Sequence, residues 1–155
     1  MRDSNLSSNV RKIDYIFEKI GKYKTDDGEI DSYLAKYLCI ISSGFLEESV
    51  RNIFGQFVKN KSHLYVANYV DDRLYYFQNA KADEIIKLAY SFSKKWGDDL
   101  KDYMTDERKD SINTIVNNKN LIAHGKNSGI TYSAMQKNWE NSKEVVEFIK
   151  LLCKL

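Results

Sequence analysis

The segment from Lys119 to Gly125, Lys-Asn-Leu-Ile-Ala-His-Gly, combines residue types that could act on an RNA phosphate. It places a cation five residues before His124, one of only two histidines in the chain, with Asn120 between them and Lys126 just beyond. Cleavage at phosphorus needs a cation for the phosphate and a group that titrates near neutral pH for the proton, as imidazole does. A helix that ends at a glycine can hold both groups rigidly.

Lys119 occupies an unexpected position on the helix predicted around it. At about 100° per residue, residues 106–124 form an apolar stripe that has Lys119 near its middle. The stripe consists of Ile112, Ile115, Val116, Ile122 and Ala123. A lysine there must extend its ammonium to solvent, find a counter-charge, or face a cleft or a partner subunit. The sequence leaves a structural and a functional role equally open.

Asn120 and His124 are four residues apart, so they are neighbours at the edge of the same stripe. A histidine in the last turn of a helix can also simply cap carbonyl groups at the negative end of the helix dipole. A purely structural role for His124 therefore stays open. The other histidine, His63, sits at a predicted helix start and is expected to be structural or solvated.

Other chemistries find little support in the sequence. The two histidines lie far apart and no Cys-x-x-Cys pair occurs, so we expect no zinc or other metal site. The chain has no glycine-rich phosphate loop and no Gly-x-Ser-x-Gly elbow, and we expect no cofactor. Glu47 and Glu48 could act as acid–base or metal-binding carboxylates, but a solvated helix face is the simpler interpretation.

The elements that must position these residues are predicted to be helices. Apolar residues recur at helical spacing over residues 8–22, 29–59, 62–76, 82–96, 105–124 and 131–152, with a short helical turn at 100–104. This pattern predicts an all-α bundle of about five to six helices with one long second helix, in a single domain spanning 1–155. Ser62, Thr105 and Thr131 are the expected N-caps, Gly125 the C′ glycine, and Gly97 the end of the fourth helix.

Composition narrows the class of protein further. The chain has 155 residues, no proline and a formal charge of +2, which is too balanced to indicate nucleic-acid binding by bulk charge. Cys39 and Cys153 lie in apolar runs and are expected to be buried small side chains, as in a reducing cytoplasm. We expect no signal peptide and no membrane span, because neither a signal-type apolar core nor a run of about 20 apolar residues occurs.

Residues 118–125 resemble the signature of HEPN domains, in which an arginine precedes a histidine near a helix end, commonly as Arg-Asn-x-x-Ala-His. Residues 45–51 look like the family's long second helix. Residues 77–86 are similar to the Asn-Pro-containing turn and following helix of the RiboL-PSP-HEPN branch, as are Phe92, Trp96 and residues 129–131. The resemblance covers residues 30 to 150. One departure is Lys119, which stands in place of the motif arginine and offers phosphate a point charge rather than a planar fork.

The resemblance implies a homodimer in which two motifs face each other across a cleft. It also implies a metal-independent endoribonuclease of a defence or toxin-type system, cleaving RNA by attack of the 2′-OH. His124 would be the general acid or base, Lys119 would stabilise the phosphorane, Asn120 would orient the phosphate or the histidine, and Lys126 would contact the RNA backbone. The implied partners are RNA, a second copy of the chain, and a cognate antitoxin or defence-system protein.

Two other functions remain open. A catalytically weakened or inactive HEPN module would bind RNA or a protein partner through the same cleft, and the lysine at position 119 and the modest charge favour it. A dimerisation scaffold with no nucleic-acid role would depend on neither Lys119 nor Lys126 for anything except stability. Cleavage products separate the nuclease from the other two.

Overall fold

The structure, a computed structural model, describes residues 3–23 and 25–155. These residues form seven helices and no strand, which confirms the predicted all-α bundle, with one helix more than expected. The helices are α1 (Asp3–Lys22), α2 (Gly28–Lys61), α3 (Leu64–Tyr75), α4 (Ala82–Phe92), α5 (Lys94–Tyr103), α6 (Asp106–Ala123) and α7 (Tyr132–Leu152).

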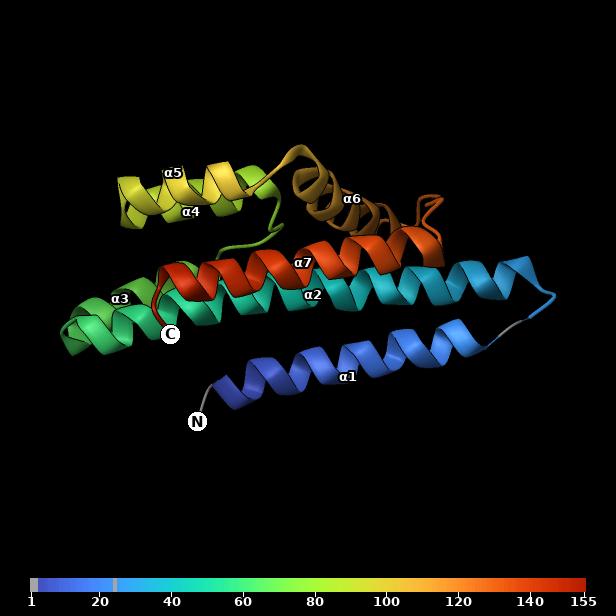
Figure 1. Cartoon of the computed structure of the whole chain (residues 1–155), viewed down its shortest axis with the longest axis horizontal. Coiled ribbons are helices and arrows are strands. Elements are labelled where there is room, and N and C mark those ends of the chain that lie inside the picture. Colours follow the sequence, from blue (N-terminus) through green and yellow to red (C-terminus); the bar gives the residue numbers. More distant parts are fainter. Residues whose placement is uncertain (1–2, 24) are drawn as a thin grey trace.

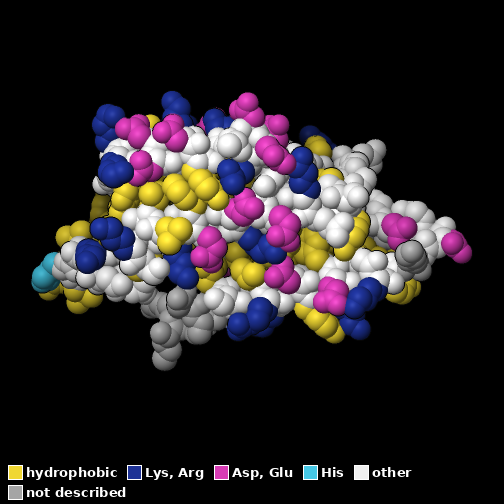
Figure 2. Space-filling model, viewed as in Figure 1, with side chains coloured by type: hydrophobic (Ala, Val, Ile, Leu, Met, Phe, Trp, Pro, Cys, Tyr) yellow, Lys and Arg dark blue, Asp and Glu magenta, His cyan; other side chains and the backbone are white. Residues whose placement is uncertain are grey.

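The long second helix, α2, lies at the centre of the molecule and contacts most of the other helices. α2 runs alongside α7 through the middle of the bundle, with α1 on one side and α6 and the α4–α5 hairpin on the other (Figure 1). It contacts α1, α3, α6 and α7, so one helix aligns most of the others. Acidic and basic side chains alternate over the face seen in Figure 2, in keeping with the balanced composition.

Two clusters of aromatic side chains pack the outer helices against α2. Trp139 of α7 is almost fully buried, stacks on Phe17 of α1 at 5.7 Å between ring centres, and meets Phe45 of α2 edge-on at 4.8 Å. Its indole N–H donates to Asp14 at 2.7 Å, so the buried ring leaves no polar group unpaired. At the other end of α2, the rings of Phe54, Phe57, Phe92 and Trp96 hold the α4–α5 hairpin.

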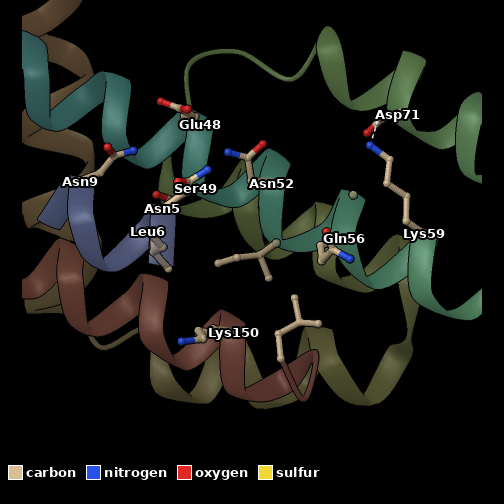
Figure 3. A pocket seen from close by; sticks show the side chains of 13 residues that line it. Asn5, Leu6, Asn9, Glu48, Ser49, Asn52, Gln56, Lys59, Asp71 and Lys150 are labelled. Carbon is tan, nitrogen blue, oxygen red and sulfur yellow. Dashed lines mark hydrogen bonds and ion pairs between the residues drawn. The ribbon is translucent and has the colours of Figure 1, made fainter. Parts of the chain in front are cut away.

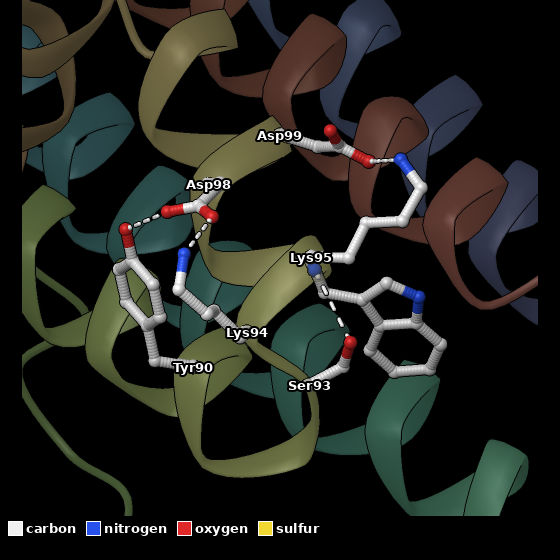
Figure 4. Close-up of polar contacts among 7 residues, drawn as sticks. Tyr90, Ser93, Lys94, Lys95, Asp98 and Asp99 are labelled. Atoms are coloured by element: carbon white, nitrogen blue, oxygen red, sulfur yellow. Dashed lines mark hydrogen bonds and ion pairs between the residues drawn. The ribbon is translucent and has the colours of Figure 1, made fainter.

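The predicted end of the fourth helix is wrong. The helix stops at Phe92, and Ser93 starts a new one, with its hydroxyl accepting from the backbone N–H of Trp96 at 3.4 Å (Figure 4). Gly97 lies inside α5, where a Cβ would come within 2.1 Å of Cδ1 of Tyr90. The glycine therefore permits close contact with the Tyr90 ring rather than ending a helix.

The predicted cap of the third helix is also wrong. Ser62 is the C-cap of α2, and both its N–H and its hydroxyl donate to the carbonyl of Val58. His63 is the N-cap of α3 and accepts from the N–H of Tyr65 through Nδ1 at 3.4 Å. The expected structural, solvated role of His63 is confirmed, and so is the burial of Cys39 and Cys153, whose thiols are free. Within the described residues, none of the helices has the length and apolar character needed to cross a membrane.

Candidate functional site

The end of α6 is closed by a defined set of backbone hydrogen bonds. Thr105 caps its start by accepting from the N–H of Arg108, as predicted. At the other end, Gly125 has φ +66, its N–H donates to the carbonyl of Ile122, and the N–H of Lys126 donates to that of Leu121 at 2.8 Å. This pair of bonds is the Schellman arrangement, which needs a residue in the left-handed region. The predicted C′ role of Gly125 is therefore confirmed, and the backbone of His124, the C-cap, is fixed.

The loop after α6 is anchored to the helix by Asn118. Its amide N donates to the carbonyl of Thr114 at 2.8 Å, and its Oδ1 accepts from the hydroxyl of Ser128 at 2.7 Å. Ser128 in turn accepts from the N–H of Ile130, and both residues are buried. The chain that follows His124 therefore returns to a set position before α7 begins at the predicted cap, Thr131.

Lys119 finds a counter-charge on α2. Its ammonium lies 3.7 Å from Oε1 of Glu47 and donates to Oδ1 of Asn79 at 3.1 Å. The side chains of Lys119 and Glu47 are only 24% and 15% exposed, so their attraction is screened less than that of a surface pair. The lysine on the apolar stripe is thus held by polar partners from two other segments.

Asn79 belongs to the turn between α3 and α4, and that turn is rigidly placed. Asn79 adopts φ +52, a conformation that asparagine tolerates better than most residues, and its N–H donates to Oε1 of Glu47 at 2.8 Å. The N–H of Ala82, at the start of α4, donates to the amide oxygen of Asn113 on α6. Ala80 and Ala82 are fully buried, so the turn is fastened to both α2 and α6.

Glu47 is not the solvated carboxylate that the sequence predicted. Glu48 is exposed, but Glu47 faces the turn and α6, where it meets Lys119 and Asn79. Its second oxygen, Oε2, accepts from Nη2 of Arg51 at 3.2 Å. Asn79 and Arg51 were not predicted from the sequence as parts of the site, although both lie in segments that carry the family resemblance.

A buried thiol lies behind this cluster. Sγ of Cys39 donates to the carbonyl of Ile115 on α6 at 3.3 Å, linking the two helices near Lys119. Burial raises the pKa of Cys39 to about 11, and a hydrogen bond with the backbone of Lys119 and the charge of that residue offset only part of the rise. The thiol therefore stays protonated at neutral pH and acts as a packing group.

Lys119 and His124 do not meet within one chain. Five residues on an α-helix correspond to a separation of about 140° around the axis and about 7.5 Å along it. In the described part of the chain, the imidazole of His124 is exposed and makes no hydrogen bond, ion pair or ring contact. Asn120 is half-buried and Lys126 is exposed. The structure thus gathers Lys119 with Glu47, Asn79 and Arg51, and leaves the other three predicted site residues outside that cluster.

The larger cavity lies elsewhere. It has a volume of 1110 Å³ and is bordered by α1, α2 and the ends of α3 and α7, with the amides of Asn5, Asn9 and Asn52 around it (Figure 3). A smaller cavity of 680 Å³ lies between α1 and α7. None of the four predicted site residues lines either cavity. Neither of these two cavities therefore lies at the motif, and His124 and Lys126 are exposed at the end of α6.

Comparison with known families identifies the chain. The model of the RiboL-PSP-HEPN family matches residues 4–154, almost the whole sequence. The chain belongs to the RiboL-PSP-HEPN family. The resemblance to HEPN domains seen in the sequence is confirmed. Searches of curated proteins and of solved structures gave no match.

Proposed function

We propose that this HEPN module is a metal-independent endoribonuclease of a defence or toxin-type system. The 2′-OH of the RNA attacks the adjacent phosphorus and loses its proton, while the 5′-oxygen leaves and gains one, giving a 2′,3′-cyclic phosphate and a 5′-OH. The observation that carries the proposal is that the family match includes all of α6, where Lys119 lies in the last turns and the C-cap His124 has a fixed backbone. His124 is the general acid or base, because an imidazole has one nitrogen that can accept a proton and one that can donate it.

Lys119 is the electrostatic partner in this mechanism. Its ammonium stabilises the extra negative charge of the phosphorane, and Glu47 and Asn79 hold it in place beforehand. Asn120 orients the phosphate or the imidazole, and Lys126 contacts the RNA backbone just past the helix. No metal is needed, because the nucleophile belongs to the substrate.

We infer that the active form is a homodimer in which two copies share one cleft, because Lys119 and His124 of one chain lie about 140° apart around the axis of α6. A bare stripe on α2 supports this. Ile30, Tyr33, Tyr37 and Ile40 are between 38% and 56% exposed, and their spacing of three and four residues continues to Gly44. Glu47 follows on the same helix, so a second copy seated on the stripe adjoins the Lys119 cluster.

A binding module without catalysis is the second candidate, and the geometry of Lys119 favours it. The ammonium is already engaged by a carboxylate and an amide, and both compete with a phosphate for it. Such a module would bind RNA, or a protein such as a cognate antitoxin, and release no products.

The deciding experiment is incubation of total RNA in EDTA with the wild type and with His124→Ala, followed by analysis of the product ends. Loss of proton transfer should lower the cleavage rate by about 10²–10⁴-fold. His63→Asn, which keeps an N-cap on α3, is the matched control and should cleave like the wild type. Full activity of His124→Ala, or products without cyclic phosphate, would reject the mechanism. RNA binding without products from the wild type would support the binding module.

A further inference from the structure

A second cation lies beside Lys119 and has no role in the mechanism above. Arg51 is one turn after Glu47 on α2, and its Nη2 donates to Oε2 of Glu47 at 3.2 Å. The other oxygen of the same carboxylate is 3.7 Å from the ammonium of Lys119. A guanidinium on α2 and an ammonium on α6 therefore flank one carboxylate.

The charges of this group do not cancel. Arg51 and Lys119 carry two positive charges and Glu47 one negative charge, and no other carboxylate in the described residues pairs with either cation. Two cations held close together at a half-buried position repel each other. One further negative charge is needed for neutrality, and a phosphodiester group carries one.

The guanidinium of Arg51 also has hydrogen-bonding capacity to spare. It has five N–H donors, yet within the described chain it donates only to Glu47, and its Nε is buried without a partner. The planar fork is not used on both oxygens of Glu47, since in the described residues Nη2 donates to Oε2, whereas Oε1 accepts from the N–H of Asn79 at 2.8 Å. The side chain is 29% exposed, so a ligand can reach the guanidinium.

We propose that Arg51 and Lys119 together form a binding site for a phosphate of the RNA strand, with Arg51 supplying the planar fork that the lysine lacks. The polyanion's identity as RNA rests on the function proposed above. Glu47 is a positioning residue, because it holds both cations without touching the substrate.

The test measures binding rather than cleavage. The probe is a fluorescent single-stranded 2′-O-methyl oligoribonucleotide, which cannot be cut because its 2′-oxygen is blocked. Arg51→Met should weaken binding about tenfold, the effect of losing charge-assisted hydrogen bonds. It should also reduce the slope of log affinity against log salt concentration by about 0.7, one phosphate contact on a single strand. Arg73→Met removes the same charge from the exposed face of α3 and should change neither quantity.

Two further variants separate the fork from the charge. Arg51→Lys keeps the charge and should lose most of the affinity that Arg51→Met loses, while keeping the salt slope. Arg51→Met combined with Lys119→Arg should recover most of the affinity, because one guanidinium again lies beside Glu47. Unfolding midpoints measured in parallel show whether each variant is folded. If Arg51→Met does not fold, the comparison of Arg51→Lys with the wild type tests the proposal instead.

The outcomes of this experiment are independent of the nuclease assay. If Arg51→Met binds the probe as tightly as Arg73→Met and has the same salt slope, the phosphate site is wrong even when the wild type cleaves RNA. If the wild type never cleaves but its binding depends on Arg51, the site stands and the catalytic proposal fails. Absence of any binding by the wild type overturns the site.

Discussion

Two groups of charged side chains in this protein differ in the sequence separation of their members and in their exposure. On α5, Lys94 pairs with Asp98 and Lys95 with Asp99, each at 2.7 Å, and the side chains are 38% to 86% exposed (Figure 4). The pair between Lys119 and Glu47 joins α6 to α2 over 3.7 Å with both side chains largely shielded. The two ion pairs within α5 are therefore shorter than the pair that joins α6 to α2.

Burial and connectivity, not distance, decide how much an ion pair contributes to stability. Exposed pairs four residues apart contribute little, because water and salt screen them and the side chains lose entropy. The α4–α5 hairpin is held by aromatic packing, so it does not depend on its ion pairs. The Glu47 carboxylate, in contrast, fastens α2 to the α3–α4 turn and to α6.

The largest expected effect is on catalysis at Lys119. Lys119→Met should lower the rate of RNA cleavage by at least about 100-fold, the cost of removing one donor to a developing oxyanion. Lys95→Met removes an equal charge from the exposed pair and should leave the rate unchanged. Lys119→Arg should retain or raise the rate. The initial rates of RNA cleavage by all three variants are measured in EDTA. Equal rates for Lys119→Met and Lys95→Met would show that the buried and the exposed lysine do not differ in their effect on catalysis.

The next effect is on stability. Glu47→Ala should lower the free energy of unfolding by about 2–3 kcal/mol, because it leaves two half-buried cations and the N–H of Asn79 without their acceptor. Asp99→Ala should change it by no more than a few tenths of a kcal/mol. Urea denaturation gives both values, and a similar loss in the two variants would contradict the role assigned to burial.

Packing should matter more than charge on the α4–α5 hairpin. Gly97→Ala forces a methyl group against the ring of Tyr90 and should lower the free energy of unfolding by about 1–2 kcal/mol. That loss exceeds the one expected for Asp99→Ala on the same helix. The urea midpoints of the two variants, measured side by side, decide the order.

The smallest effect concerns the bare stripe of α2. An added Cβ at Gly44 meets no atom within 4 Å, so Gly44→Ala should stabilise the isolated chain by about 0.5–1 kcal/mol through helix propensity. If a second copy packs against the stripe, the same methyl group should weaken the dimer. Sedimentation at several protein concentrations measures dissociation of the dimer. Tyr37→Glu, which puts a charge on the same stripe, should also weaken it. If neither variant changes dissociation, the dimer interface is not on this stripe.

Most features governed by neighbours in the chain were predictable from the sequence, although the N-cap of α3 is His63 and not Ser62. The caps at Thr105 and Thr131 and the glycine at 125 depend on a few adjacent backbone groups, and all three are found as expected. Gly97 could not be interpreted in this way, because its role depends on the ring of Tyr90 from the preceding helix. From the sequence alone, a glycine after an apolar run looks the same whether it ends a helix, as Gly125 does, or lies inside one, as Gly97 does.

The helical wheel correctly placed Lys119 on a largely buried face, but it could not identify a partner. Glu47 and Asn79 come from segments 72 and 40 positions earlier, and only the packing of α6 on α2 brings them together. The roles of Asn120, His124 and Lys126 remain predictions, because the described residues provide no side-chain hydrogen bond or ion pair that would define them.

The sequence separation of Glu47, Asn79 and Lys119 has a consequence for biosynthesis. A ribosome that has delivered the chain only through α4 has released the carboxylate and the turn, but not the ammonium that they hold. Contacts between such distant positions form late in folding, because long loops must close first. An incomplete or misfolded copy therefore lacks the assembled cluster.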